Sequence, residues 1–403
     1  MVPPPPVPEP TPEPVPAPTP EVVAAGPVKV GVLLPLSGPN AAIGRAMLDA
    51  AQMALFDVGD KELQLLPRDT QGTPQGAADA AQAALGEGAR FLIGPLLAGE
   101  VERVKPIAKA ANVRVLAFST ATQFAGDGTY LMGFLPKEEV SRVVAFAHQR
   151  GMTKFAALAP NSAYGQIAVD ALKAAVEGNG SEVTQVEFYD PQATDVAPSI
   201  RRLADYEKRR AALAAQKKQL EAAGDDASKA ALQRMASQNT SGDADFEALL
   251  IPEGVARLKT LAPLLPYYDL DPARVKFLGT GLWDEPGLAS EPSLVGAWYA
   301  AAPLAQRRDF ERRYQQLYGS RPVRLATLGY DAAALAAVLA REEKGPDFSD
   351  GALTNPSGFA GLDGIFRLRT DGLVQRGLAV MEIQRNGSPV VGPAAETFQQ
   401  FTN

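Results

Sequence analysis

From Val28 onward, short runs of aliphatic and β-branched residues alternate with alanine-rich segments of helical periodicity. The pattern predicts a buried strand over Val28 to Leu34, a turn over Ser37 to Asn40 and a helix over Ala41 to Phe56. Strand and helix patterns then repeat in the same order. This alternation is typical of βα units, in which crossover helices cover both faces of a parallel sheet. We therefore expect an α/β protein.

The strand and helix patterns fall into two groups, which predicts two Rossmann-like lobes. The first group ends with a strand over Val113 to Phe118, and around Tyr130 to Leu135 the chain is expected to enter the second lobe. The strands expected in the second lobe are Phe155 to Ala159, Val183 to Phe188, Phe246 to Ile251 and Val275 to Leu278. Ligands of open parallel sheets bind outside the carboxyl ends of the strands. Two such lobes therefore leave a cleft between them, and binding residues should lie there.

The cysteine and histidine counts exclude most enzyme chemistry. The chain of 403 residues has no Cys and a single His, His148, which rules out thiol nucleophiles, disulfides and metal sites with several Cys or His ligands. His148 is expected at the end of a helix, where a cation interacts favourably with the helix dipole. Gly279-Thr280-Gly281 lacks the third glycine of a dinucleotide-binding loop, because Asp284 stands there. We expect a protein that is not an enzyme and binds no cofactor and no metal.

Charge and hydropathy narrow the possible partners. The 39 Lys and Arg residues against 46 Asp and Glu give a net charge of −7, without the basic surface that nucleic acids require. No run approaches the ~20 apolar residues of a membrane-spanning helix. Met1 is followed by Val2 and Pro3 without a signal region, which indicates either a cytosolic protein or one whose export signal and lipid anchor were removed.

Proline dominates the start of the chain, where eleven of the 34 prolines lie between Pro3 and Pro20. Proline fixes φ and has no N–H group, so residues 1–26 should form an extended segment that rises about 3.1 Å per residue. We interpret this segment as a disordered tether. A low-complexity terminus without a role and a PxxP ligand for a partner remain as alternatives.

Residues 199–242 form a polar segment that is rich in helix-forming residues. Ile200 to Ala223 predicts one helix, Gly224 to Asp226 a turn with a cap, and Ala227 to Ser237 a second helix. The segment carries nine Lys or Arg against five Asp or Glu. We expect a basic helical hairpin on an acidic protein. It is either a solvated projection or a docking site for a protein or an anionic polymer.

Four motifs occur in the order and spacing of a known family: Lys29 to Gly38, Phe91 to Pro95, Asn161 to Gly165 and Gly329 to Ala332. Together they resemble the type I periplasmic binding proteins, whose familiar members are the leucine-binding and other branched-chain amino-acid-binding proteins of ABC importers. The resemblance implies two lobes with parallel sheets joined by a three-strand hinge. Such a Venus-flytrap clamp closes on a small ligand without covalent chemistry.

Two further stretches, Gly279 to Pro286 and Gly364 to Arg376, resemble one branch of this family more closely. That branch comprises the penicillin-binding protein activators, outer-membrane lipoproteins that regulate a peptidoglycan synthase. The proline-rich tether would suit such an anchored protein.

The resemblance also implies ligand-binding residues at the ends of strands. In the amino-acid binders, hydroxyl groups after the third and fourth strands hold the ligand carboxylate. The fourth-strand position offers Ser119, Thr120 and Thr122 here, whereas Leu96 to Gly99 lack the hydroxyl expected after the third strand. This departure weakens the case for an amino acid as the ligand.

From the second lobe, the resemblance implies Tyr164 as a cover over the ligand and Glu253 near it. Trp283 would form a cleft wall, and Asp284 would be an acidic partner for a ligand ammonium group. Ser37, Tyr330 and Asp331 complete the predicted set, with turn formation, helix capping and hinge bracing as their alternative roles.

These observations divide the chain into five parts. Residues 1–26 are the tether, 27–134 plus 300–345 form lobe 1, 135–299 plus 346–392 form lobe 2 with the hairpin insertion, and 393–403 are a tail. The predicted function is capture of a small, amino-acid-like ligand in the periplasm for an ABC permease. The alternative is activation of a penicillin-binding protein. Either protein would be held at the outer membrane by an N-terminal lipid that is missing from this chain.

Overall fold

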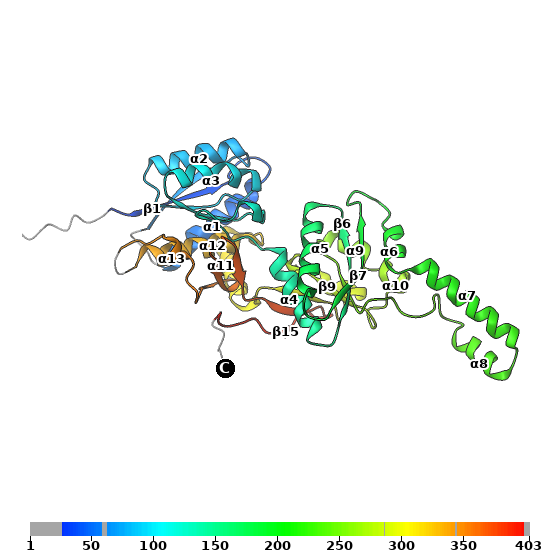
Figure 1. Cartoon of the computed structure of the whole chain (residues 1–403). Coiled ribbons are helices and arrows are strands. Elements are labelled where there is room, and N and C mark those ends of the chain that lie inside the picture. The colour runs from blue at the N-terminus through cyan, green and yellow to red at the C-terminus, as the bar shows by residue number, and fades with distance from the viewer. Residues whose placement is uncertain (1–25, 59–62, 286, 343–344, 399–403) are drawn as a thin grey trace, which may run out of the picture.

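A computed structural model describes residues 26–58, 63–285, 287–342 and 345–398. The described chain forms two α/β lobes, with a helical projection at the outer end of the second lobe (Figure 1). The expected tether lies outside these ranges apart from Gly26, and so do the last residues of the expected tail. Among the described helices, none is long and apolar enough to cross a bilayer.

Lobe 1 is built on a five-stranded sheet in the order β2-β1-β3-β4-β5. All neighbouring strands run parallel, and Val30 of β1 pairs with Leu65 on one side and Phe91 on the other. A strand with neighbours on both sides and helices on both faces is buried, which explains the continuous apolar run of β1. The strands are β1 (Val28–Leu34), β2 (Leu63–Asp69), β3 (Phe91–Ile93), β4 (Arg114–Ala117) and β5 (Thr129–Leu131).

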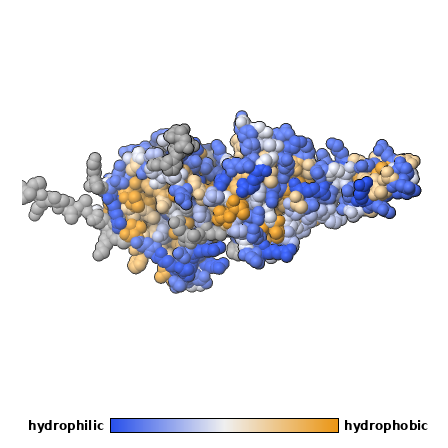
Figure 2. All heavy atoms as spheres, turned by 90° about the horizontal axis from the view of Figure 1, so that it is seen from below, coloured by the Kyte–Doolittle hydropathy of each residue, from blue (hydrophilic) through white to orange (hydrophobic). Residues whose placement is uncertain are grey.

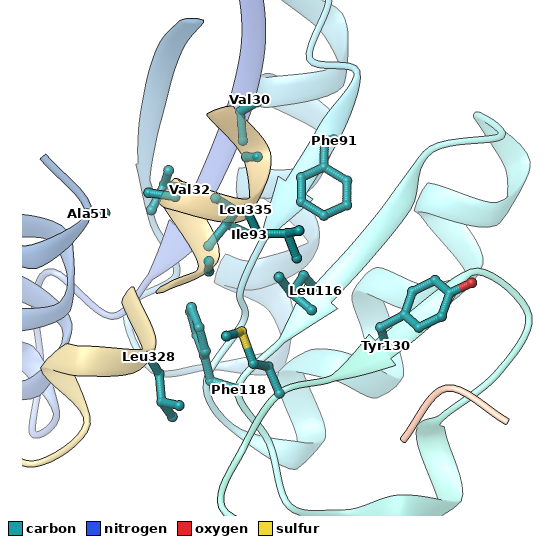
Figure 3. Close-up of a cluster of buried hydrophobic side chains, with 14 of the residues drawn as sticks. Val30, Val32, Ala51, Phe91, Ile93, Leu116, Phe118, Tyr130, Leu328 and Leu335 are labelled. Carbon is teal, nitrogen blue, oxygen red and sulfur yellow. The ribbon is translucent and has the colours of Figure 1, made fainter. Parts of the chain in front are cut away.

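Helices cover both faces of the lobe 1 sheet. On one face, Val30 and Val32 of β1 meet Ala51 of α1 and Leu335 of α12 (Figure 3). On the other face, Leu33 lies in a separate core under α2 and α3. Successive side chains of a strand point to opposite faces, so β1 serves both cores. The helices are α1 (Ala41–Val58), α2 (Pro74–Gly86), α3 (Ala98–Ala110), α11 (Leu304–Tyr318) and α12 (Ala326–Ala340).

Lobe 2 has a seven-stranded sheet in the order β15-β14-β10-β9-β8-β6-β7. The strands from β6 to β10 pair in parallel, and β14 and β15 add an antiparallel edge. Helices α4 and α5 cover one face, and α6, α9 and α10 cover the other. The strands are β6 (Lys154–Pro160), β7 (Glu182–Tyr189), β8 (Ala248–Leu250), β9 (Lys276–Gly279), β10 (Trp298–Ala301), β14 (Ala379–Glu382) and β15 (Val390–Gly392). The helices are α4 (Pro136–His148), α5 (Ala163–Val176), α6 (Ala197–Leu203), α9 (Val255–Leu261) and α10 (Leu264–Tyr267). Pro263 separates α9 from α10.

The chain crosses between the lobes three times: after β5, after β10 and before β14. Because β5 leads into α4 of lobe 2 and β10 leads into α11 of lobe 1, the carboxyl ends of both parallel sheets face the other lobe. The loops that follow these strands are therefore the ones that ligands of such folds contact.

Residues 346–376 lie with lobe 1, which differs from the expected division of the chain. Phe366 and Leu368 are buried in the lobe 1 core, and Leu373 bridges to Leu131 of β5. Strands β11 (Phe359–Gly361), β12 (Gly364–Leu368) and β13 (Val374–Arg376) form an antiparallel sheet there, next to α13 (Asp350–Leu353). Only β14 and β15 join lobe 2. A strand pattern shows that a segment is extended, but the choice of sheet depends on contacts far away in the sequence.

The expected hairpin forms the projection at the end of lobe 2 that lies away from lobe 1 (Figure 1). It consists of α7 (Tyr206–Ala223) and α8 (Asp226–Arg234). The single helix expected from Ile200 breaks at Asp205, whose φ of 47° is left-handed and separates α6 from α7. Asp225 caps α8 by accepting a hydrogen bond from the N–H of Ser228 at 2.7 Å.

One arginine fixes the base of this hairpin. Arg209 is buried and donates from Nη2 to the carbonyl oxygen of Gly242 at 2.6 Å and to Asp269 at 3.2 Å. Thr240 also donates to the Asp269 carboxylate. The first turn of α7 and the loop that returns from α8 are thus held to one side chain, so the projection is attached at a fixed angle.

Gly279 at the end of β9 should not tolerate a side chain. A Cβ there would lie 2.1 Å from a ring carbon of Trp283, which is buried in the lobe 2 core. We expect Gly279→Ala to lower the free energy of unfolding by about 1–3 kcal/mol, the usual range for an overpacked core, as measured by urea denaturation. Gly86→Ala is the control, because no atom lies within 4 Å of its Cβ position. An equal loss of stability in both variants would contradict this packing.

Candidate functional site

The loop after β1 is organised by a carboxylate from the neighbouring strand. Asp69, the last residue of β2, accepts hydrogen bonds through Oδ1 from the N–H groups of Leu36 at 2.9 Å, Ser37 at 3.2 Å and Gln71 at 2.7 Å. Burial alone would raise the pKa of Asp69, but hydrogen bonds from Ser37, Gln71 and Leu36 outweigh it and lower the pKa. The predicted site residue Ser37 is thus held in the loop by its backbone.

The loop after β3 leads into α3 through a buried carboxylate. Glu100 in the first turn of α3 is fully buried and accepts a hydrogen bond from the N–H of Leu97 at 2.9 Å. Removal from water raises its pKa. The segment Leu96 to Gly99 offers no hydroxyl here, as the sequence indicated, and its leucines pack on the lobe 1 core.

The loop after β4 carries the predicted hydroxyl groups, which differ in their exposure to solvent. Ser119 is buried, and its Oγ accepts a hydrogen bond from the N–H of Ala121 at 3.1 Å. Thr120 and Thr122 are exposed. Their hydroxyl groups are therefore the ones in this loop that remain accessible to a ligand.

On lobe 2, the residues after β6 and β9 meet each other. Tyr164, in the first turn of α5, is hydrogen bonded through its hydroxyl to Oγ1 of Thr280 at 2.9 Å. Burial, together with the nearby carboxylate of Glu139, raises the pKa of Tyr164, so the phenol is neutral. The ring is only half-buried, because α5 begins at the edge of the sheet that faces lobe 1.

Glu253 follows β8 and lies in the same group of lobe 2 loops. Its Oε1 accepts a hydrogen bond from the N–H of Gly254 at 2.8 Å, and its Oε2 accepts one from the hydroxyl of Tyr189. Burial and this bond to Glu253 raise the pKa of Tyr189. The carboxylate is thus fixed in position next to Tyr189.

Glu139 is a functional candidate that the sequence analysis did not identify. It is buried in the first part of α4, directly after the first crossing, and accepts a hydrogen bond from the N–H of Gly281 at 3.0 Å. Gly281 has no room for a side chain, because a Cβ would lie 2.5 Å from Glu139 Oε1. Burial raises the pKa of Glu139 to about 7, although Gly281, Arg324 and Arg376 favour its charged form.

Trp283 and Asp284 follow β9, but their side chains contact other parts of the protein. Trp283 was expected as a cleft wall, but it is buried in the lobe 2 core, where it acts as a packing anchor. Asp284 forms an ion pair with Arg307 of α11, and both side chains are 7% exposed. This buried pair connects lobe 2 to lobe 1. The Asp284 carboxylate therefore already has Arg307 as its cationic partner.

Tyr330 and Asp331 lie in α12, inside lobe 1. The hydroxyl of Tyr330 donates to Asp57 of α1 at 2.9 Å, which braces the two helices. Asp331 is buried and accepts a hydrogen bond from the N–H of Leu362 at 2.7 Å. These contacts brace α12 within lobe 1, whereas the expected alternative was bracing of the hinge.

The structure therefore brings the predicted residues into three groups. Ser37, Ser119, Thr120 and Thr122 lie in the lobe 1 loops, and Tyr164 and Glu253 lie in the lobe 2 loops. The other four have structural roles, because Trp283 and Asp331 are buried, Asp284 pairs with Arg307 and Tyr330 bonds to Asp57. The sequence analysis missed Asp69, because its role depends on hydrogen bonds to a loop 32 to 33 residues away along the chain. His148 ends α4 as expected, and its Nδ1 lies 3.0 Å from Oγ of Ser181. Among the described residues, no cluster of His, Asp and Glu could hold a metal ion.

A family model described as periplasmic binding protein matches residues 27–388, so this chain belongs to the periplasmic binding protein family. Among curated proteins, the Leu/Ile/Val-binding protein homolog 6 of Brucella abortus is 29% identical over 187 residues, which cover 44% of this chain and 48% of that protein. The chain spans about half the length of the curated relatives it matches.

Two solved structures show the same fold over nearly the whole chain. An ABC transporter substrate-binding protein from Sphaerobacter thermophilus is 15% identical with a TM-score of 0.67, covering 92% of this chain and 97% of that one. A solute-binding protein from Rhodopseudomonas palustris in complex with 3,4-dihydroxybenzoic acid is 17% identical with a TM-score of 0.61 and the same coverage. The predicted family and two-lobed fold are confirmed, whereas the resemblance to penicillin-binding protein activators stays a prediction.

Glu139 should make stability depend on pH. Its pKa is about 7 in the folded chain against 4.5 for an unperturbed glutamate. The folded state therefore binds this proton more tightly, and stability falls as pH rises from about 4.5 to 7, by on the order of 3 kcal/mol. Glu139→Gln should flatten this part of the melting-temperature profile and raise the melting temperature at pH 8. Glu102→Gln, exposed on α3, should leave the profile unchanged. A Glu139→Gln profile that follows the wild type would refute this assignment.

Proposed function

We propose that this protein captures a small, amino-acid-like ligand between its lobes and delivers it to an ABC-type importer in the periplasm. The observation that carries the proposal is the placement of Thr120 and Thr122 on lobe 1 and Tyr164 on lobe 2, after strands whose carboxyl ends face the other lobe. The name of the Brucella relative supports an amino-acid ligand. The complex of the Rhodopseudomonas protein supports small carboxylic acids more widely.

The two half-sites offer complementary groups. Thr120 and Thr122 supply hydroxyl groups that can donate to a ligand carboxylate. On the opposite side, Tyr164 supplies an aromatic ring, and the fixed Glu253 carboxylate supplies an acceptor for an ammonium group. Three crossings allow the lobes to rotate towards each other, and a ligand that contacts both lobes favours the closed arrangement.

The lobe 1 half-site differs from that of an ordinary amino-acid binder. No hydroxyl follows β3, and the N–H of Leu97 already donates to Glu100. The apolar side chains of Leu36 and Leu97 lie at the same edge of the lobe. Together these features favour a ligand that carries an apolar group and forms few polar contacts with lobe 1.

Tyr164→Ala combined with Thr122→Val should weaken ligand binding by at least about 30-fold, which corresponds to ~2 kcal/mol for a lost aromatic contact and hydrogen bond. The ligand is first identified by a thermal-shift screen against amino acids and small aromatic acids, and its affinity is measured by calorimetry. Tyr267→Ala is the control, because this residue is 68% exposed on α10. Unchanged affinity in the double variant would refute the site, and no thermal shift with any compound would refute ligand capture.

A second candidate function is supported by the hairpin of α7 and α8. Its attachment through Arg209 makes it a fixed arm, and Lys208 and Arg210 are exposed near its base. A projection that is only solvated gains nothing from a buried arginine that fixes its orientation on lobe 2. We propose docking of a protein partner on this arm, with a penicillin-binding protein as the partner implied by the sequence resemblance.

The docking proposal predicts that Lys208→Gln with Arg210→Gln lowers the affinity for a purified penicillin-binding protein about 10-fold or more, because exposed charges steer and hold partners. Surface plasmon resonance at low salt measures this. Arg103→Gln with Lys173→Gln removes the same charge from exposed sites on α3 and α5, and its affinity should equal that of the wild type. Equal losses in both double variants would indicate a net-charge effect and exclude docking through the arm.

A further inference from the structure

A cavity lies beside the crossings, apart from the loops of the proposed ligand site. It has a volume of about 780 Å³, which is within the usual range for small-molecule sites. One wall comes from lobe 1, with α11 and the segment from Arg321 to Arg324. The other wall comes from lobe 2, with Asp284, Glu285, residues 287–289, Tyr299 and Ser388. Of the predicted ligand-binding residues, only Asp284 lines this cavity.

The lobe 1 wall concentrates arginine. Five guanidinium groups line the cavity against three carboxylates, and they are supplied by Arg307, Arg308, Arg312, Arg321 and Arg324. Arg308, Glu311, Arg312 and Gln315 follow the i, i+3, i+4, i+7 spacing of one helix face. The opposite face of α11 packs on α1 through Phe310 and Tyr314. The orientation of α11 therefore turns its charged face to the cavity.

Three of these arginines have acidic partners inside the protein. Arg307 pairs with Asp284, Arg324 pairs with Asp363, and Arg312 forms an exposed pair with Asp309 of the same helix. Exposed ion pairs of this kind contribute little to folding stability. Arg308 and Arg321 form no ion pair or hydrogen bond within the described part of the chain, and both are exposed.

We propose that this cavity binds a small anion that carries carboxylate or phosphate groups, held by Arg308 and Arg321. The planar guanidinium group has paired N–H donors that match both kinds of anion. The hydroxyl groups of Tyr299 and Ser388 on the lobe 2 wall add neutral hydrogen-bonding partners. The chain as a whole carries a charge of −7, whereas the lining of this cavity has more arginines than carboxylates. The net charge of the protein repels anions, so an anion that binds here must be attracted by the cavity itself.

The anion site differs from the proposed cleft in its residues and in its chemistry. The cleft residues Thr120, Thr122 and Tyr164 do not line the cavity. An anion that contacts both walls would bridge lobe 1 and lobe 2 next to the buried pair of Asp284 and Arg307. Anion binding should therefore persist in a variant whose cleft is disabled.

The test uses citrate and inorganic phosphate as probes, each compared with sodium chloride at the same ionic strength. Both anions should raise the melting temperature of the wild-type protein by several degrees, because a ligand that binds only the folded state stabilises it. Calorimetry then gives each dissociation constant. Arg308→Gln with Arg321→Gln should weaken binding at least about 10-fold, and the Tyr164→Ala with Thr122→Val variant should bind both anions like the wild type.

Arg103→Gln with Arg90→Gln is the control for loss of charge, since both residues lie on lobe 1 away from this cavity and outside its lining. Binding of citrate alone would assign the site to carboxylates, and binding of phosphate alone would assign it to phosphates. The proposal is overturned if neither anion shifts the melting temperature beyond sodium chloride. It is also overturned if the Arg308→Gln with Arg321→Gln variant binds like the wild type or like the control.

Discussion

Buried charges fix the first and third crossings at the points where they leave lobe 1. Arg376, at the end of β13, is buried and donates from Nη2 to the carbonyl oxygen of Met132 in the first crossing at 2.8 Å. Its guanidinium also lies 5.0 Å from the ring centre of Phe134, and that of Arg324 lies 4.2 Å from the same ring. Two segments that are far apart in the sequence are thereby fixed around one aromatic side chain.

Carboxylates complete this buried network. Asp363 has no exposed side-chain surface and accepts hydrogen bonds from Thr327 at 2.6 Å and from Arg324 at 3.1 Å. Burial acts to raise the pKa of Asp363, but Arg324 and Arg376 outweigh it and keep the pKa low. Burial and the charge of Asp363 raise the pKa of Asp331 to about 7. Because an unpaired buried charge is costly, these groups favour one arrangement of the crossings, and the loops that face the other lobe follow from it.

Two glycines decide how closely the backbone approaches neighbouring side chains in the loop after β9. Gly281 brings backbone against the Glu139 carboxylate, and Gly279 brings it against the ring of Trp283.

The space-filling view shows mostly polar side chains on the arm of α7 and α8 and on much of both lobes, with apolar surface gathered at separate places (Figure 2). The arm therefore differs from the lobes in its shape and its charge more than in its hydropathy.

Local patterns in the sequence determined the element types, their order and the family, because helix and strand periodicity act over a few residues. Val28 to Leu34 is an example, since its apolar run and bounds appear unchanged as β1. From the sequence, Thr120, Thr122 and Tyr164 were predicted as ligand-binding residues and the hydroxyl after β3 was found to be missing, and the structure leaves both threonines exposed and the tyrosine half-buried. The tertiary structure alone decided that β11 to β13 join lobe 1, that Trp283 and Tyr330 are structural, and that Asp284 pairs with Arg307. These outcomes depend on contacts between residues far apart in the chain, and on the cost of burying a charge without a partner, which no short stretch of sequence contains.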